Sequence, residues 1–237
     1  MKKIFIIFSF TMLCVNISAQ RVGFIGGYQL TTPFPIAAGK VIDFNEKSGS
    51  GFHIGGYFDW DFHKRFGLDI QILYTMRNIN FDINYLLDTT KNFTTHFVRN
   101  TFNLEIPLHI YANFHIKKGW FLSPFLGPSF NIGLHGKDIA WENTEYKKPV
   151  DLQTKDLYGK DNRMNRFELA AEAGLMLKHK NYGVRASYSV GLTNLTTQKY
   201  AFTTSLPTTN SPKTHYNRFL YNGVFKLSFV YVFDLRK

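Results

Sequence analysis

The sequence predicts an all-β fold, an eight-stranded antiparallel up-and-down transmembrane β-barrel. Three observations support it: apolar and polar residues alternate strictly, the alternating runs are long, and the connections between them are alternately long and short. Strands of soluble sheets usually contain about 5–6 residues, whereas about 9–11 tilted residues cross a bilayer. Bacterial outer-membrane barrels combine an even number of strands with short periplasmic turns and long external loops.

The alternation is clearest in residues 52–76. Apolar residues occupy every second position in 52–62, apart from one glycine, and again in 66–76. Each run predicts a strand with one apolar and one polar face. Two such runs around a short polar segment predict a β-hairpin.

The turn of this hairpin is expected to contain three residues. A two-residue turn would pair Phe62 with Arg65, although their parities place them on opposite faces. Of the two three-residue registers, one sets Asp59 against Asp69, and like charges opposite each other are unfavourable. We therefore expect the other register, in which Asp61 pairs with Arg65.

The same alternation predicts the remaining strands, with apolar residues outward and polar residues inward. A soluble sandwich or a lipocalin-like barrel is the alternative, but neither requires connections that alternate so regularly. Aromatic residues make up 17% of the sequence, which suits the aromatic girdles of a membrane barrel. Segments 78–96 and 135–165 are predicted to be long external loops. The predicted strands cover 22–31, 52–62, 66–76, 97–113, 120–134, 166–178, 181–194 and 217–234.

Residues 1–19 are predicted to be a cleaved signal peptide. A basic start, an apolar core at 4–15 and small residues before Gln20 are typical of such peptides. A transmembrane anchor is the alternative, but it needs about 20 apolar residues. Residues 20–237 are then one outer-membrane β-barrel domain. Because Cys14 is the only cysteine, that domain has no disulfide, thiolate nucleophile or cysteine metal site.

Four segments resemble the small outer-membrane β-barrel family of Bacteroidetes, the PorT-like outer membrane protein beta-barrel domain with its porin-like fold. They are 104–108 (LEIPL), 125–129 (FLGPS), 183–194 (GVRASYSVGLTN) and 225–233 (FKLSFVYVF). The resemblance covers most of the mature chain and implies the fold and a bacterial outer-membrane location. The family's namesake acts in protein secretion and gliding, but no residue here singles out that subgroup.

The search for chemistry yields no catalytic motif. The phosphate loop, the helical zinc motif and the Gly-x-Ser-x-Gly elbow are missing from the sequence. Glu105 and His109 share the inward face of one strand, as an acid/base pair, as half of a metal site or as a polar filling. Ser187 and Ser189 also point inward, without a histidine on their strand. We predict no enzymatic activity, no cofactor and no metal site.

An eight-stranded barrel is just wide enough for side chains to fill it. Charged residues at inward positions are expected to form this filling, which disfavours a wide pore. A turn at His179-Lys180 would place Arg185 diagonal to Glu172, so we expect these two to be in contact. The predicted barrel-interior polar network consists of Asp59, Asp69, Glu105, His109, Glu168, Glu172, Arg185 and Lys226.

The formal charge of +11 is concentrated at short turns, whereas the segment 135–165 is charge-balanced. This distribution disfavours nucleic-acid binding. It predicts a periplasmic basic rim that meets anionic phospholipid headgroups, with solvated turn lysines as the alternative. The predicted rim consists of Lys64, Arg65, Lys117, Lys118, Lys178 and Lys180.

The sequence therefore predicts a non-enzymatic outer-membrane barrel with a filled interior and long extracellular loops. Its expected partners are outer-membrane lipid and, through those loops, an adhesion surface or another protein. The alternatives are a component of a secretion or gliding system, a narrow channel and a lipid-modifying enzyme.

Overall fold

The computed structural model describes residues 20–37, 44–88, 91–142, 149–150, 157–158, 164–195 and 218–234. The predicted signal peptide lies outside the described residues. In the part of the chain that is described, no helix is long and apolar enough to cross a membrane.

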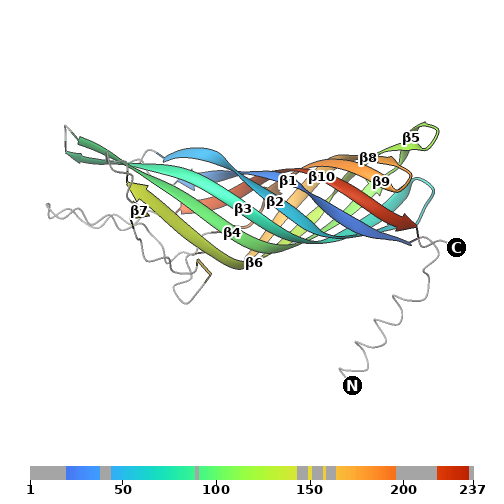
Figure 1. The fold of residues 1–237 in the computed structure, drawn as a ribbon, viewed down its shortest axis with the longest axis horizontal. Coiled ribbons are helices and arrows are strands. Elements are labelled where there is room, and N and C mark those ends of the chain that lie inside the picture. The colour runs from blue at the N-terminus through green and yellow to red at the C-terminus, as the bar shows by residue number, and fades with distance from the viewer. Residues whose placement is uncertain are drawn as a thin grey trace, which may run out of the picture.

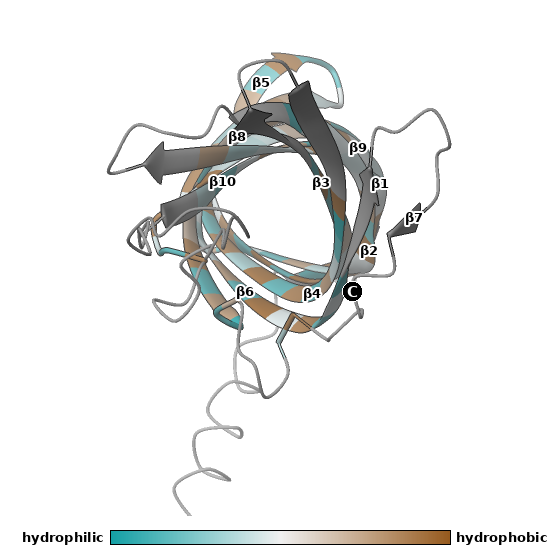
Figure 2. Ribbon diagram, turned by 90° about the vertical axis from the view of Figure 1, so that its left-hand side faces the viewer, coloured by the Kyte–Doolittle hydropathy of each residue, from teal (hydrophilic) through white to brown (hydrophobic). Residues whose placement is uncertain are grey.

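The structure is a closed antiparallel barrel (Figures 1 and 2), which confirms the predicted fold class. Pairing of the first strand with the last, from Arg21↔Asp234 to Ala37↔Arg218, closes the wall. Eight strands form that wall, because β5 continues β4 after Asn113 and β7 only adds two residues beside β6. The elements are β1 (Gln20–Ala37), β2 (Phe44–Asp61), β3 (Phe66–Asp88), β4 (Lys91–Ala112), β5 (Phe114–Lys117), β6 (Trp120–Glu142), β7 (Pro149–Val150), β8 (Phe167–His179), β9 (Tyr182–Gly191) and β10 (Arg218–Asp234).

The two faces of the wall differ as the alternation requires. Outward positions hold aliphatic and aromatic side chains, such as Phe24 and Leu126, which are 66% and 67% exposed. The positions between them point into the lumen and are mostly polar, as the alternating colours along the strands in Figure 2 indicate. Such an outer surface suits hydrocarbon, where a closed barrel satisfies every ladder hydrogen bond internally.

The two ends of the barrel are unlike each other (Figure 1). One end holds the turns at 62–65, 118–119 and 180–181 together with Gln20 and Asp234, and we call it the short-turn end. We call the opposite end the long-loop end.

Two strands continue where long loops were predicted. β3 extends to Asp88 and β4 begins at Lys91, so the prediction of a loop at 78–96 is wrong. Pairing runs from Asn78↔Asn100 to Asp88↔Lys91. β6 likewise continues to Glu142, into the predicted loop 135–165. In β3, apolar residues at 79, 81, 83 and 85 alternate with asparagine or aspartate at 78, 80, 82 and 84, which is the pattern of a strand.

The register of the β2–β3 hairpin also differs from the prediction. Asp59 lies directly opposite Asp69, in the register that the like charges seemed to forbid, and the predicted Asp61–Arg65 pairing is wrong. Each of the two carboxylates binds a cation from a third strand, as described below. A rule for one pair of strands does not include these cations, because Arg21 comes from β1 on the other side of β2, and Arg185 comes from β9 across the lumen.

The turn of this hairpin has a two-residue tip. His63 N donates to Phe66 O at 3.1 Å, and Phe66 N donates to His63 O at 3.3 Å. Lys64 and Arg65 therefore occupy the tip. The expectation of a three-residue turn is wrong, although the turn is not centred on His63-Lys64.

The β8–β9 turn is shifted by one residue from the prediction. His179 pairs with Tyr182, so that Lys180 and Asn181 form the tip. Lys180 has a φ of 51°, in the left-handed region, and positive φ at the tip is typical of the two-residue turns that match the twist of a hairpin. Arg185 consequently lies opposite Met176.

The outer face of β3 offers a test of the lipid-facing assignment. Ile70 is exposed on that face near the middle of the wall. Because an arginine at the bilayer midplane costs about 2–4 kcal/mol, Ile70→Arg should lower the free energy of unfolding by that amount. Urea unfolding in liposomes measures it, with Ile70→Met as the uncharged control of similar size. Equal stabilities of the two variants would contradict the assignment.

Candidate functional site

The lumen is the region of the molecule where charged side chains gather. All eight residues predicted for the interior network lie there, and each is at most 3% exposed: Asp59, Asp69, Glu105, His109, Glu168, Glu172, Arg185 and Lys226. A buried charge is costly unless it is paired and hydrogen-bonded. The contacts among these residues therefore determine what the lumen can do.

One lysine binds two carboxylates at the centre of the lumen. Lys226 of β10 donates hydrogen bonds to Glu105 of β4 and to Glu172 of β8, the latter at 2.8 Å. Ser129 of β6 donates to the same Glu105 carboxylate at 2.8 Å. The two contacts of Lys226 cross the lumen and join strands that are not neighbours in the wall, whereas Ser129 and Glu105 lie on the paired strands β6 and β4.

Arg77 of β3 links this centre to the long-loop end. Its guanidinium donates to Glu105 Oε2 at 3.0 Å and to Glu168 Oε2 at 2.8 Å, and Asn131 donates to the same Glu168 oxygen at 2.6 Å. Arg77 was not among the predicted network residues. Its parity could have identified it, because it follows Asp69 on the same face of β3 by an even number of residues.

Asp69 anchors a second cluster nearer the short-turn end. Arg185 of β9 donates to Asp69 Oδ2 at 3.0 Å, and its guanidinium lies 3.3 Å above the ring of Phe125. His109 Nδ1 lies 2.9 Å from Asp69 Oδ1 and 2.7 Å from Arg185 Nη2. Arg185 and Glu172 both face the lumen, as expected. They were predicted to contact each other, but Arg185 binds Asp69 and Glu172 binds Lys226.

Glu105 and His109 do not form the acid/base pair that was weighed for them. Glu105 is bound to Lys226 and Arg77, whereas His109 lies beside Asp69. Nε2 of His109 is 3.8 Å from Glu172 Oε2. This distance separates the Asp69 cluster from the central one.

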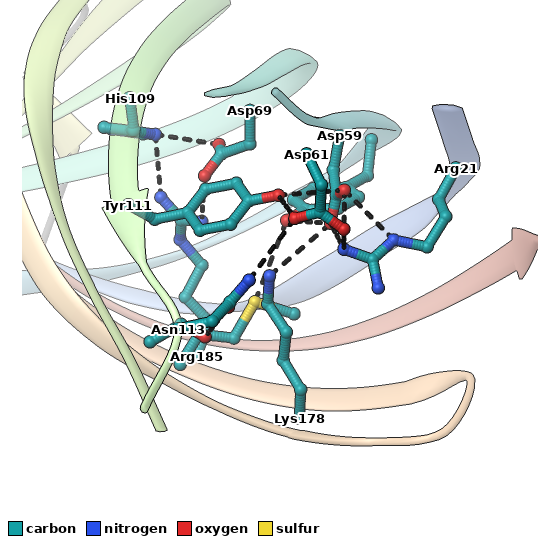
Figure 3. A network of polar contacts seen from close by, with 12 residues as sticks. Arg21, Asp59, Asp61, Asp69, His109, Tyr111, Asn113, Lys178 and Arg185 are labelled. Carbon is teal, nitrogen blue, oxygen red and sulfur yellow. Dashed lines mark hydrogen bonds and ion pairs between the residues drawn. The ribbon is translucent and has the colours of Figure 1, made fainter. Parts of the chain in front are cut away.

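A third cluster closes the short-turn end (Figure 3). Arg21 Nη2 donates to Asp59 Oδ1 at 2.8 Å and to Asp61 Oδ2 at 3.0 Å. The hydroxyl of Tyr111 donates to Asp61 at 2.7 Å and lies 3.1 Å from Asp59 Oδ1. Lys178 Nζ lies 3.5 Å from Asp59 Oδ2 and 3.9 Å from the centre of the Tyr111 ring.

The assignment of Lys178 to the basic rim is therefore wrong. Lys178 is 8% exposed and points into the lumen, because it has the same even parity on β8 as Glu168 and Glu172. The other members of the predicted rim are exposed at the short-turn end: Lys64, Arg65, Lys117, Lys118 and Lys180.

A small apolar cluster covers the lumen at the long-loop end. It consists of Leu157, Tyr158, Met164 and Leu195, each at most 4% exposed, and we call it the plug cluster. Leu157 N donates to Gly136 O at 3.1 Å, and Met164 N donates to Leu157 O at 3.1 Å.

The plug cluster packs against two glycines of β6, Gly133 and Gly136, which we call its seat. A Cβ at Gly136 would lie 2.9 Å from Leu157 Cδ1, and a Cβ at Gly133 would collide with the ring of Tyr158. Below the plug cluster lies a cavity of about 10 Å³, lined by residues that include Arg77 and Asn131. A cavity of this size has room for about one water molecule.

One histidine–serine pair lies in the lumen wall. His53 Nε2 lies 2.8 Å from Ser228 Oγ, and within the described part of the chain His53 Nδ1 has no hydrogen-bond partner that could act as an orienting acid. Both side chains are buried in the lumen wall. Among the described residues, no group of three or more histidine, cysteine, aspartate or glutamate side chains could hold a metal ion.

The model of one protein family, described as outer membrane protein beta-barrel domain, matches residues 18–197. The chain belongs to this family. Membership places it in the bacterial outer membrane. The comparison with curated proteins gave no match.

Similar solved structures are outer-membrane barrels of low sequence identity. OprG of Pseudomonas aeruginosa is 12% identical, with 92% of this chain and 97% of that chain covered and a TM-score of 0.46. Ail, the attachment invasion locus protein of Yersinia pestis, is 15% identical, with 91% and 99% covered and a TM-score of 0.39. Neisserial surface protein A is 11% identical, with 89% and 97% covered and a TM-score of 0.34.

Removing the central lysine should destabilise the barrel strongly. Lys226→Met leaves two buried carboxylates without their shared cation, and breaking a buried pair costs about 3–5 kcal/mol. Lys178→Met should cost less, because Asp59 keeps Arg21. Urea unfolding in liposomes compares the two variants. The double variant Lys226→Met/Glu172→Gln should recover part of the loss, and no recovery would contradict the assigned pairing.

The seat of the plug cluster can be tested by thiol labelling. Without residues 1–19 the chain has no cysteine, so Leu157→Cys is a single reporter. Gly133→Ala should displace Tyr158 and raise the labelling rate of that cysteine by at least about tenfold, because its burial is lost. Gly56→Ala is the control, since nothing lies within 4 Å of a Cβ at that position. Equal rates in the two backgrounds would show that the seat is wrongly assigned.

Proposed function

We propose that the protein is a non-enzymatic outer-membrane barrel that contacts a partner or an adhesion surface through its long-loop end, which faces the outside of the cell. The observation that carries this proposal is a sheet that continues beyond the lipid-facing band, with the polarity of its faces reversed along β3. We call it the extracellular sheet. It comprises 44–48 of β2, 78–88 of β3, 91–100 of β4 and 137–142 of β6.

The reversal is clearest along β3. Up to Arg77, lumen-facing positions are mostly polar, and outward positions such as Ile70 and Ile72 are apolar. Beyond it, positions in line with the lumen-facing ones hold Ile79, then phenylalanine, isoleucine and tyrosine at 81, 83 and 85. Positions in line with the outward ones hold asparagine or aspartate at 78, 80, 82 and 84.

A change of medium accounts for this reversal. An outward face must be apolar in hydrocarbon and polar in water, so the strands leave the bilayer near Arg77. The backbone register aligns the apolar positions, with Phe81 opposite Phe97. Ile79, the first of them on β3, is 2% exposed. The backbone pairing therefore supports a sheet in water rather than a set of loops.

The edge of the extracellular sheet suits recognition. Among the described residues, pairing between β1 and β2 ends at Thr31↔Gly49, so the backbone of β2 at 44–48 forms an edge of the described sheet. An exposed sheet edge can accept a strand from another chain. The charge pairs and the plug cluster support a contact function further, because they leave the described lumen without a wide path.

The proposal includes the finer features that the sequence predicts. Residues 1–19 act as a cleaved export signal, and the chain belongs to the PorT-like group of Bacteroidetes. A role in secretion or gliding would be one form of the partner contact. The filled lumen supports a structural role for its polar network, and the lack of an orienting acid beside His53 supports the absence of enzymatic activity.

Shortening the β3–β4 hairpin tests the proposal. Replacing 82–96 by Asn-Gly removes the outer part of β3 and β4 from the extracellular sheet and leaves the lipid-facing wall intact, so the barrel should still fold and show heat-modifiable migration. Crosslinking in native outer membranes, followed by copurification, should then lose the partners captured by the full chain. Asp82→Ser, which keeps the hairpin, should retain them. Identical capture by the shortened barrel would contradict the proposal.

A further inference from the structure

A two-stranded hairpin projects from the barrel at the short-turn end. Pairing between β3 and β4 ends at Phe66↔Ala112, and Asn113 interrupts the strand. β5 then pairs with β6 alone, through Phe114↔Leu122 and His115↔Phe121. Figure 1 shows β5 at the same end as the C-terminus.

Asn113 holds the base of this hairpin in place. Its backbone N donates to Arg65 O at 2.7 Å, and its side chain donates to Asp61 Oδ1 at 3.3 Å. Ser123 donates to Asn113 Oδ1 at 2.6 Å. The hairpin therefore has a fixed direction relative to the wall.

The hairpin exposes apolar and aromatic side chains. All four residues of β5 are exposed, and Phe114 and Ile116 are each 57% exposed. Phe114 pairs with Leu122, a residue of the outward face of β6, so the apolar face of the hairpin continues the lipid-facing surface. Trp120 stacks on His179 of β8, with ring centroids 4.5 Å apart.

Cations surround these aromatic residues. Lys117 Nζ lies 5.7 Å from the centre of the Trp120 ring, and Lys118 and Lys180 are exposed in the two adjacent turns. Among residues of the short-turn end whose exposure the structure describes, every exposed Asp, Glu, Lys or Arg side chain is basic. The carboxylates of Asp59 and Asp61 are turned toward Arg21.

We propose that the β5–β6 hairpin, with Lys117, Lys118 and Lys180, is a docking surface for anionic phospholipid headgroups of the leaflet at the short-turn end. Phe114 and Ile116 enter the acyl region, and Trp120 lies at the headgroup level, where tryptophan is enriched in membrane proteins. The three ammonium groups contact the phosphates. Lipid fits better than a protein partner, because the apolar face is continuous with the bilayer-facing wall and the charge is of one sign.

Quenching of Trp120 fluorescence by brominated lipids tests the proposal. Trp60→Phe and Trp141→Phe leave Trp120 as the only tryptophan of the three in the sequence. In phosphatidylcholine bilayers, brominated phosphatidylglycerol should quench Trp120 at a lower mole fraction than brominated phosphatidylcholine. Lys117→Gln and Lys118→Gln should each reduce this preference by up to about fivefold, and high salt should reduce it as well.

Lys137→Gln provides the matched control, because Lys137 is exposed at the long-loop end of β6. It should leave the preference unchanged. Equal quenching by the two lipids in the parent protein would overturn the proposal, as would an equal loss in Lys137→Gln. If a protein occupies the surface instead, the preference for the anionic lipid is absent and the proposal fails.

Discussion

The pairing of buried charges in the lumen is the constraint on which the rest of this structure depends. The inward positions of a narrow barrel carry carboxylates, arginines and lysines, and none of these can remain buried without a partner. Lys226 binds Glu105 and Glu172, Arg77 binds Glu105 and Glu168, and Arg185 binds Asp69. Except for Arg77–Glu105, which joins the neighbouring strands β3 and β4, these pairs join strands that are not neighbours. The strands are therefore held by interactions across the lumen as well as by their ladders.

This constraint explains why the sheet pairs as it does. A hairpin that sets Asp59 against Asp69 is unfavourable as an isolated pair of strands. Within the barrel, Arg21 binds the first carboxylate and Arg185 the second, so the register is acceptable only in the complete fold. Outside the bilayer the constraint changes. Along β3 the apolar positions then move to the face that continues the lumen wall, which supports the proposed extracellular sheet.

Much of the fold follows from the alternation in the sequence, because the parity of a residue sets the face on which it lies. Parity predicted the inward position of Glu168 and the outward position of Ile70. The parity of Lys178 also indicates an inward position, but Lys178 lies close to a turn and was therefore assigned to the basic rim. Registers were harder to predict, since they depend on charges from third strands. Strand ends were hardest, because the reversal of polarity beyond Arg77 resembles the irregular pattern of a loop.

The sequence could predict which residues line the lumen, but not which of these residues form ion pairs with each other. Sequence parity lists the residues that face the lumen, yet the order in which acids and bases meet across it depends on the shear of the closed barrel. The plug cluster had no sequence signal, because its members come from separate segments and are held by two glycines of β6. The assignment of function accordingly rests on the extracellular sheet and on a lumen closed by charge pairs.

Single-channel recording in planar bilayers tests that closed lumen most directly. The purified barrel should insert without producing stepwise current, because the paired side chains and the plug cluster fill the path between the two ends. A persistent, stepwise conductance of the parent protein would contradict this account, because ions would then cross a lumen that we describe as closed by charge pairs.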